Sequence, residues 1–444
     1  ILLTFIAIMN DNPKKKFIGT LPQKELLKLY SQHVNGPKVR FFKSLGLGVI
    51  PGEREGVILR TLEGSRKDDP PLEMYNCRTS GGVYNLGHGN PRIIQIVKDA
   101  LDGGLDIGDH ILLSEQRALL GKKLADLMPG DISKTTFGVA GGEAVDCAIK
   151  FSRAYTKRKG CISAIGGYHG HTGFALATGD PVFKDNFLWN LPEFKQIPFG
   201  DVDAMRKAVT DDVACVILET IPATGGILIA DEGYFAEVRK ICEEKGTMMI
   251  IDEVQAGLGR TGELWAIYGG LYSNEKVVPD FIVLGKGMSS SIYPLSTCSY
   301  KPFIEKAVYK DDPFIHISTT GGSDIGCAIA LEMLNIQSDP KFLNHVKEMG
   351  KFFQKGLEEI KDDFPDLVNG VRGRGLMWGF EFHNESDSQI GMLSIIKEGV
   401  LLDYCNNKKD TLKILPPLIV QRDELEIILE KIRNGIIKLK KIKK

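Results

Sequence analysis

The hydrophobic positions in the middle of the chain form four short continuous runs, each of which ends in polar or glycine-rich residues. The runs are CISAIGGY (161–168), ACVILET (214–220), MMIIDEV (248–254) and DFIVLGK (280–286). Continuous apolar runs are typical of parallel strands that are covered by helices on both faces. Helical periods such as GYFAEVRKICEEKG (233–246) lie between them, so the repeating unit is strand, helix, strand. Right-handed crossovers between such units predict a doubly wound α/β layer with a mostly parallel sheet.

The two ends of the chain show a different pattern. Turns and short strands precede residue 80, whereas long helical periods and then short strands follow residue 325. We therefore expect an N-terminal segment over 1–80, a large domain over 81–325 and a C-terminal α+β domain over 326–444. The two chain ends together would form a smaller α+β domain beside the central sheet.

Composition restricts the possible partners. The 444 residues are 43% hydrophobic and carry a formal net charge of -1, so no overall charge favours nucleic acid or an anionic membrane. The eight cysteines are scattered through apolar segments without CxxC spacing, which favours reduced thiols in a cytoplasmic protein over disulfides or zinc. No metal-ligand constellation and no nucleic-acid motif stands out.

The N-terminal run ILLTFIAIMN is too short to span a bilayer and lacks the flanks of a signal peptide. Met9 is an equally good start, in which case residues 1–8 are an upstream extension. The basic C-terminal end, IIKLKKIKK, is interpreted as a solvated last helical turn rather than a membrane anchor.

Lys286 stands directly after the fourth apolar run, at the edge where a parallel sheet binds ligands. One interpretation is a lysine at a strand end whose amine reaches water. The other is a Schiff-base lysine, whose burial lowers the pKa of the amine so that it can attack a carbonyl. The third run ends in Asp252 and Glu253, which places a carboxylate at the same edge as the amine. The two charges could simply pair, yet pyridoxal phosphate needs both groups, at its aldehyde and at its ring nitrogen.

The sequence also contains a candidate phosphate-binding segment. In FGVAGGEAV, the residues Gly141 and Gly142 precede the first turn of an amphipathic helix, where free N–H groups and the helix dipole favour an anion. A plain glycine turn into a helix is the alternative for this segment taken alone. Tyr168 is available to stack on an aromatic ring.

From about residue 70 to the C-terminus the chain resembles the fold-type I, class III pyridoxal-phosphate aminotransferases, which include the ornithine, acetylornithine, lysine 6- and 4-aminobutyrate enzymes. The resemblance is carried by nine motifs, and it is specific because the motifs occur in the family's order and spacing. These motifs are YNLGHGNP (84–91), GGEAVDCAIK, GYHGHT, ILETI, IIDEVQAGLGRTGELWA (250–266), LGKGMSSS, STTGGSD (318–324), VRGRGLMWGFEF (371–382) and LKILPPLIV (412–420).

The resemblance implies a role for each matching residue. Lys286 would form the Schiff base and move a proton between substrate and cofactor, and Asp252 would pair with the pyridine nitrogen. Gln255 would hydrogen-bond the ring hydroxyl, with Val254 on one face of the ring and Tyr168 on the other.

Further cofactor contacts follow from the same resemblance. Gly141 and Gly142 would hold the phosphate, and Thr319 would reach it from the neighbouring subunit, which implies a homodimer. Glu219 matches the family pattern. His169 would pack beside the ring, although a structural histidine is an equally good interpretation.

The chain departs from the family where substrate would bind. His171 replaces an arginine for a distal carboxylate, Lys413 replaces the arginine for the α-carboxylate, and Thr224 replaces a gating glutamate. Lysine cannot reproduce the two-pronged contact of arginine with a carboxylate. Val83, His171 and Lys413 are therefore the candidate substrate contacts.

The leading prediction is transamination of an ω-amino acid or amine, such as a 4-aminobutyrate-, ornithine- or lysine-like donor, to a 2-oxo acid. A racemase, aminomutase or decarboxylase on the same scaffold is the alternative, because small changes around this cofactor select the bond that breaks. A binding module without catalysis is a third class, which Lys286 and Asp252 disfavour.

Overall fold

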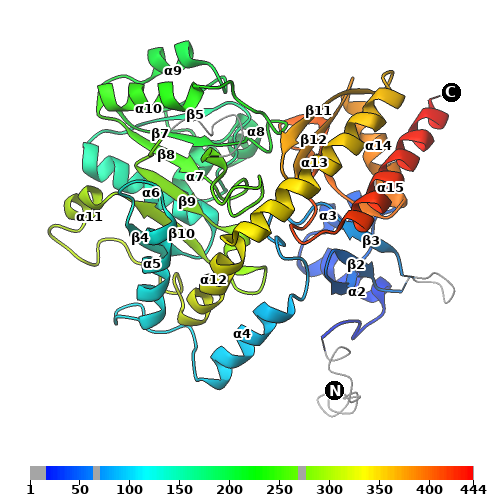
Figure 1. Ribbon diagram of the computed structural model, residues 1–444, viewed down its shortest axis with the longest axis horizontal. Helices are drawn as coiled ribbons and strands as arrows, with labels where there is room; N and C mark the ends of the chain where they lie inside the picture. The colour runs from blue at the N-terminus through cyan, green and yellow to red at the C-terminus, as the bar shows by residue number, and fades with distance from the viewer. Residues whose placement is uncertain (1–16, 64–70, 269–276, 444) are drawn as a thin grey trace.

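The computed structural model describes residues 17–63, 71–268 and 277–443, so the question of Met9 and residues 1–8 lies outside the described residues. A seven-stranded sheet forms the centre of the larger part (Figure 1). β10 runs antiparallel to both its neighbours, and the pairs from β9 to β6 are parallel. The sheet order is β4 (Lys134–Gly138), β10 (Ser296–Tyr300), β9 (Phe281–Leu284), β8 (Met248–Asp252), β7 (Val213–Glu219), β5 (Gly160–Ala164) and β6 (Phe194–Ile197).

Both faces of this sheet are buried, which explains the continuous apolar runs. In β8, Ile250 packs with the core beside α6 (Gly141–Thr156), whereas Ile251 packs with the core beside α10 (Tyr234–Lys245). The first face is covered by α6 (Gly141–Thr156), α7 (Gly173–Ala177) and α11 (Pro302–Val308). The second face is covered by α5 (Glu115–Leu127), α9 (Val202–Ala208), α10 (Tyr234–Lys245) and α12 (Asp324–Gln337).

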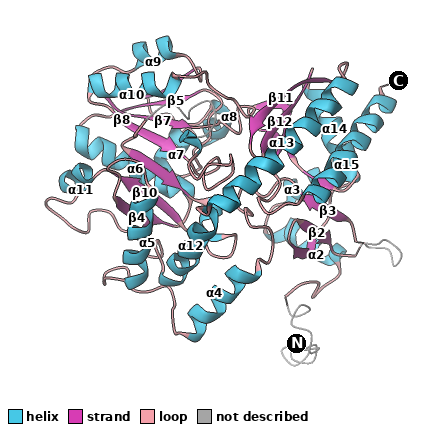
Figure 2. Ribbon diagram, viewed as in Figure 1, coloured by secondary structure: helices cyan, strands magenta, loops and turns pink. Residues whose placement is uncertain are grey.

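Two four-stranded sheets form the smaller part, which is separate from the large sheet in Figure 2. The C-terminal sheet is antiparallel, in the order β11 (Val368–Arg374), β12 (Met377–Phe382), β15 (Lys408–Ile414) and β14 (Asp403–Cys405). It packs with α13 (Pro340–Asp363), α14 (Glu385–Lys397) and α15 (Arg422–Ile442).

The other small sheet joins the two chain ends, because the C-terminal strand β13 pairs in parallel with β3. Its order is β1 (Pro51–Glu55), β2 (Ile58–Thr61), β3 (Glu73–Asn76) and β13 (Val400–Leu401). The remaining elements are α2 (Gln23–His33), α3 (Gly36–Ser44), α4 (Pro91–Asp102), α8 (Pro181–Lys184), η2 (Asp185–Phe187), η3 (Ala266–Tyr268) and η5 (Lys286–Ser289).

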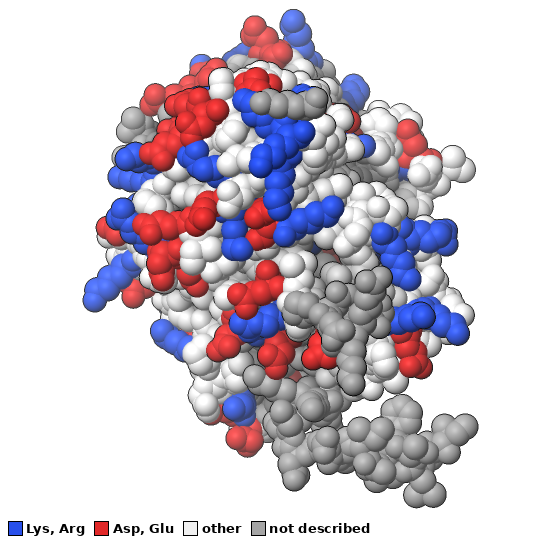
Figure 3. Space-filling model, turned by 90° about the vertical axis from the view of Figure 1, so that its right-hand side faces the viewer, with Lys and Arg blue, Asp and Glu red and all other residues white. Residues whose placement is uncertain are grey.

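The surface of the smaller part is mixed in charge. Lys and Arg side chains alternate with Asp and Glu over the face shown in Figure 3. All eight cysteines are free and buried, as expected for small core residues. Within the three described ranges, no helix is both long and apolar enough to cross a membrane.

Candidate active site

Lys286 occupies a backbone conformation that L-residues rarely adopt. β9 ends at Leu284, and Lys286 opens the short helix η5 with φ of +44°. The left-handed region is costly for a residue with a side chain, so surrounding contacts must hold it. Gly285 allows a close approach to α6, because an added Cβ would lie only 3.3 Å from the Cα of Gly141. The close approach of these two segments sets the lysine at the sheet edge.

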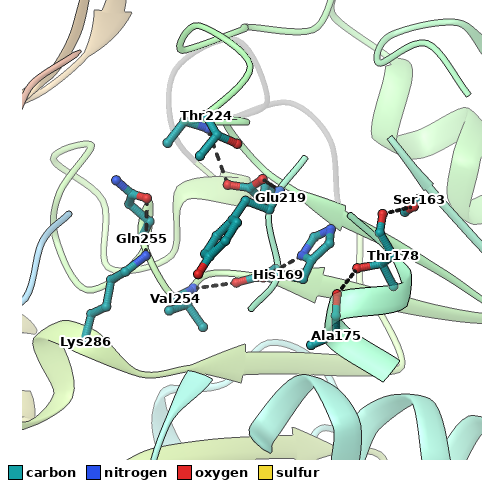
Figure 4. Close-up of polar contacts among 12 residues, drawn as sticks. Ser163, His169, Ala175, Thr178, Glu219, Thr224, Val254, Gln255 and Lys286 are labelled. Atoms are coloured by element: carbon teal, nitrogen blue, oxygen red, sulfur yellow. Dashed lines mark hydrogen bonds and ion pairs between the residues drawn. The ribbon is translucent and has the colours of Figure 1, made fainter. Parts of the chain in front are cut away.

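The Lys286 amine faces other functional groups rather than bulk water. Its Nζ donates a hydrogen bond to Oε1 of Gln255 over 3.2 Å, and Figure 4 shows the two side chains pointing toward one another. Burial lowers the pKa of the amine, although the negative charges of Asp252 and Glu219 oppose this effect. Lys413 adds to the lowering as a nearby positive charge. The environment thus shifts the amine toward its neutral, nucleophilic form relative to a lysine in water.

Asp252 is fixed at the carboxyl end of β8 by two hydrogen bonds. Oδ1 accepts from the backbone N–H of Val254 over 2.9 Å, and Oδ2 lies 2.7 Å from Nδ1 of His169. Burial lowers the pKa of His169, but its hydrogen bond to Asp252 and the charge of that residue outweigh burial, so the pKa is raised. Asp252 is therefore an acidic side chain whose orientation is fixed by one backbone N–H group and one histidine.

Glu219 lies directly beside Asp252, since the two residues pair between β7 and β8. Its carboxylate accepts from the N–H of Tyr168 over 2.8 Å and from that of Ala223 over 3.4 Å. Burial raises the pKa of Glu219 to about 6. The contact with Tyr168 fixes the loop after β5 at the same edge of the sheet.

The start of α6 is shaped to receive an anion. Ala140 precedes the helix and offers no side-chain cap, and among the described residues the N–H groups of Gly141 and Gly142 have no acceptor. An added Cβ at Gly141 would lie 3.0 Å from Cγ1 of Val254, and one at Gly142 would lie 2.7 Å from Oγ1 of Thr172. The two glycines thus let Val254 and Thr172 pack closely against the start of the helix.

These features fit pyridoxal phosphate. Nε2 of Gln255 and Nε2 of His169 are buried, and neither has a hydrogen-bond partner within the described part of the chain. Unpaired buried polar atoms cost free energy, so their presence beside free helix N–H groups indicates a polar ligand. An amine, a fixed carboxylate and an anion cradle are the three groups that this cofactor requires.

The three candidate substrate residues differ in their relation to the amine. Lys413 of β15 is only 9% exposed and acts electrostatically on Lys286. Val83 is half-buried and follows Gly81, where an added Cβ would lie 3.5 Å from Cε of Lys286. His171 is exposed, and its ring centroid is 5.3 Å from that of Tyr168.

Thr319 is exposed and forms no hydrogen bond with any described residue of its own chain. Thr224 is held in the loop after β7, where its hydroxyl donates to the backbone oxygen of Gly166 over 2.8 Å. A threonine bonded in this way has no free group to replace the family's gating glutamate.

Sequence reasoning missed two contributors to the site. Thr172 lies against Gly142, with Oγ1 2.7 Å from the position of an added Cβ, and therefore places a hydroxyl beside the helix start. Asn85 lies against Gly287, where an added Cβ would be 2.6 Å from its Nδ2. The only sequence signal for these two residues was that each belongs to a motif of the resemblance. Their contacts could not be predicted, because each contact joins segments that are far apart in the chain.

The sheet, the lysine at its edge and the anion cradle define a pyridoxal-phosphate enzyme of fold-type I. The model of the class-III aminotransferase family matches residues 52–436, and the chain belongs to that family. An uncharacterized aminotransferase of Archaeoglobus fulgidus is 45% identical over 420 residues, which are 95% of this chain and 96% of that protein. Enzymatic activity and pyridoxal-phosphate dependence follow from this membership.

Solved structures agree on the fold. The ornithine aminotransferase of Toxoplasma gondii ME49 has a TM-score of 0.84 at 22% identity and covers 95% of this chain and 96% of its own. A transaminase from the marine bacterium Virgibacillus also has a TM-score of 0.84 at 22% identity, covering 95% and 100%. These structures confirm the predicted fold class, and the family model confirms the predicted family.

Proposed function

We propose that this enzyme transfers the amino group of an ω-amino acid or amine to a 2-oxo acid, with Lys286 as the covalent attachment point of the cofactor. A desolvated lysine amine at the same sheet edge as a fixed carboxylate is the observation that carries the proposal. Burial favours the neutral amine, which is the form that attacks a carbonyl and accepts a proton.

Each group at the edge has a distinct task in this proposal. When bound, the cofactor supplies an electron sink for the carbanion formed at the substrate carbon. Asp252 keeps a positive charge on the ring nitrogen, and its bond to His169 holds it in place. Gly141 and Gly142 donate their N–H groups to the phosphate, with Val254, Tyr168 and Gln255 around the ring. The Lys286 amine would move the proton between the substrate and the cofactor.

Lys413 is the group that we assign to the substrate carboxylate. It is a buried cation for which no ion pair or hydrogen bond is present among the described residues. A buried charge without a partner is unfavourable, and a carboxylate of the substrate would compensate it. Lysine acts as a point charge, so the contact would be less directional than that of an arginine. Val83 and His171 would flank the rest of the substrate.

The active unit that we propose is a homodimer in which Thr319 reaches the phosphate of the neighbouring subunit. Thr319 is exposed, and apolar side chains are exposed close to it in the sequence, at Phe314, Ile315 and Ile317. A second exposed apolar stretch, 111–113, belongs to the loop whose Asp106 carbonyl accepts from the N–H of Ile325 over 3.1 Å. Exposed apolar surface of this kind indicates an interface.

A panel of amino donors, read by absorbance without an acceptor, tests the proposed reaction. The purified holoenzyme should lose its aldehyde-form absorbance on addition of 4-aminobutyrate, ornithine, lysine or an ω-amine, and recover it with pyruvate or 2-oxoglutarate. An absorbance that never changes with any donor would contradict transamination.

Racemisation of an amino acid is the second candidate, alongside aminomutase or decarboxylase chemistry. Two observations favour racemisation. The hydroxyl of Thr224 is bonded to the backbone, and the ring of His171 packs against aromatic rings. We therefore assign a substrate carboxylate to Lys413 alone, and one carboxylate is enough for an α-amino acid. A racemase binds the two enantiomers of one amino acid, which carry the same carboxylate, whereas a transaminase must also accept a 2-oxo acid of different structure. Loss of optical activity without change in the cofactor absorbance would identify a racemase.

A further inference from the structure

Arg260 is a fully buried arginine between β8 and β9, and it has a specific set of partners. Its Nη1 donates to the backbone oxygens of Leu376, over 3.0 Å, and Pro416. Its Nη2 donates to Oδ1 of Asn85 over 2.7 Å. The guanidinium thus joins one loop of the large sheet to three segments that are far apart in the sequence.

Two of these segments, at Pro416 and Leu376, are connected to the strand that contains Lys413. Pro416 follows β15, which contains Lys413, and Leu415 between them donates its N–H to the backbone oxygen of Cys77 over 2.6 Å. Leu376 lies in the turn between β11 and β12, and β12 pairs Gly379 with Lys413. Arg260 therefore holds both the end of the Lys413 strand and the turn at the end of the strand beside it.

The third segment lies over Lys286. Asn85 is against Gly287, the residue after the lysine, and its backbone oxygen accepts from the N–H of Leu418 over 2.7 Å. The turn that ends at Asn85 contains Val83 and Gly81, and Gly81 approaches the Lys286 side chain. A displacement of Asn85 would move this turn relative to the amine.

The buried charge of Arg260 requires a reason beyond packing. No carboxylate forms an ion pair with it among the described residues, and burial lowers its pKa to about 9. Removing a cation from water without an opposite charge is unfavourable. The five N–H donors of a planar guanidinium, however, reach three separate oxygens in fixed directions, which a lysine cannot do.

We propose that Arg260 is a positioning residue for substrate binding, which holds Lys413 and the turn at 81–85 in register with Lys286. A carboxylate on Lys413 and the amine that reacts at Lys286 belong to the same substrate, so their separation has to be fixed. This inference rests on the assignment of Lys413 to the substrate carboxylate.

Butanoate, which has a carboxylate and no amine, is the probe for this proposal. Its dissociation constant is measured by calorimetry on the holoenzyme of wild type, Arg260→Lys, Arg260→Gln and Lys413→Met. We expect butanoate to bind about tenfold more weakly to both Arg260 variants, because small displacements of a binding group have large effects. The kcat/KM of the two Arg260 variants should also fall more for 4-aminobutyrate than for propylamine, which lacks only the carboxylate.

Arg239→Lys is the matched control. Arg239 is a largely buried arginine of the large part of the molecule, with a side chain 12% exposed, but it pairs with Asp280 at the opposite end of β9 over 2.7 Å. This variant should bind butanoate like wild type. Arg260→Lys preserves the charge and provides a result if Arg260→Gln does not fold.

The outcomes separate the two claims. If Lys413→Met binds butanoate normally, the assignment of Lys413 is wrong and this inference falls with it. If Lys413→Met weakens butanoate but neither Arg260 variant does, Arg260 has no positioning role and the proposed function stands. Equal losses for 4-aminobutyrate and propylamine in the Arg260 variants would show a general structural role and overturn the inference.

Discussion

The carboxylate of Asp252 and Nδ1 of His169 lie 2.7 Å apart inside the molecule, at the edge of the sheet that also presents Lys286. Asp252→Asn keeps the size of the side chain and removes its charge. We expect kcat to fall by about a hundredfold or more, since the ring nitrogen would lose its anionic partner. Steady-state kinetics with the best donor tests this, and the bound cofactor should remain visible by absorbance. Full activity of the variant would rule out the role given to Asp252.

The glycines at the start of α6 predict a loss of cofactor affinity. In Gly142→Ala, the new Cβ would lie 2.7 Å from Oγ1 of Thr172, so the start of α6, which we propose holds the phosphate, would have to shift. Titration of the apoenzyme with pyridoxal phosphate should show binding weakened by about tenfold or more. Gly121→Ala in α5 is the control, because nothing lies within 4 Å of its added Cβ. Equal affinities of the two variants would contradict the phosphate assignment.

The stability of the fold should depend on pH through Glu253. Burial raises the pKa of this carboxyl from 4.5 to about 7, although Thr220 and two backbone N–H groups donate to it. Because the folded state holds the proton more tightly, stability falls as pH rises from 4.5 to 7, by about 3 kcal/mol from this group.

Glu253→Gln removes the titration and should abolish that part of the pH dependence. Chemical denaturation of both proteins at pH 5 and pH 8 measures it, and the difference between wild type and variant is the informative quantity. A difference that is the same at both pH values would mean that Glu253 does not titrate in this range.

The trans role of Thr319 predicts complementation between two defective chains. A hybrid dimer of Lys286→Ala and Thr319→Ala chains contains one site with an intact lysine and an intact threonine from its neighbour. Thr319→Ala alone should weaken cofactor binding about tenfold, because a phosphate contact is lost. After mixing and subunit exchange, activity at limiting cofactor should exceed the sum of the two separate variants. No gain in a mixture that forms hybrid dimers would exclude a contribution in trans.

Much of the fold could be predicted from the sequence because both faces of the central strands are buried. Runs such as the one that ends at Asp252 are apolar throughout, and their ends mark the ligand-binding edge of the sheet. β10 gave no such signal, since its residues STCSY are mostly polar. Its hydroxyl groups pair across the sheet instead, as between Ser299 and Thr135 over 2.9 Å.

The candidate site also has one part that could be predicted from the sequence and one part that could not. Asp252 ends β8, and Gln255 and Lys286 follow their strands within a few residues, so their meeting at one edge follows from the order of the strands. The contact between Arg260 and Asn85 joins positions 175 residues apart, and no local pattern predicts it. Such contacts depend on how the small sheets pack against the large one, which periodicity does not describe.

Covalent attachment of the cofactor at Lys286 is the central claim, and borohydride reduction followed by peptide mass spectrometry tests it most directly. The reduced holoenzyme should carry one cofactor-derived mass on the peptide that contains Lys286. Lys286→Ala should carry none and should lose activity by about a hundredfold or more. A modification at another lysine, such as Lys413, or an unmodified Lys286 peptide from fully loaded enzyme, would contradict the account.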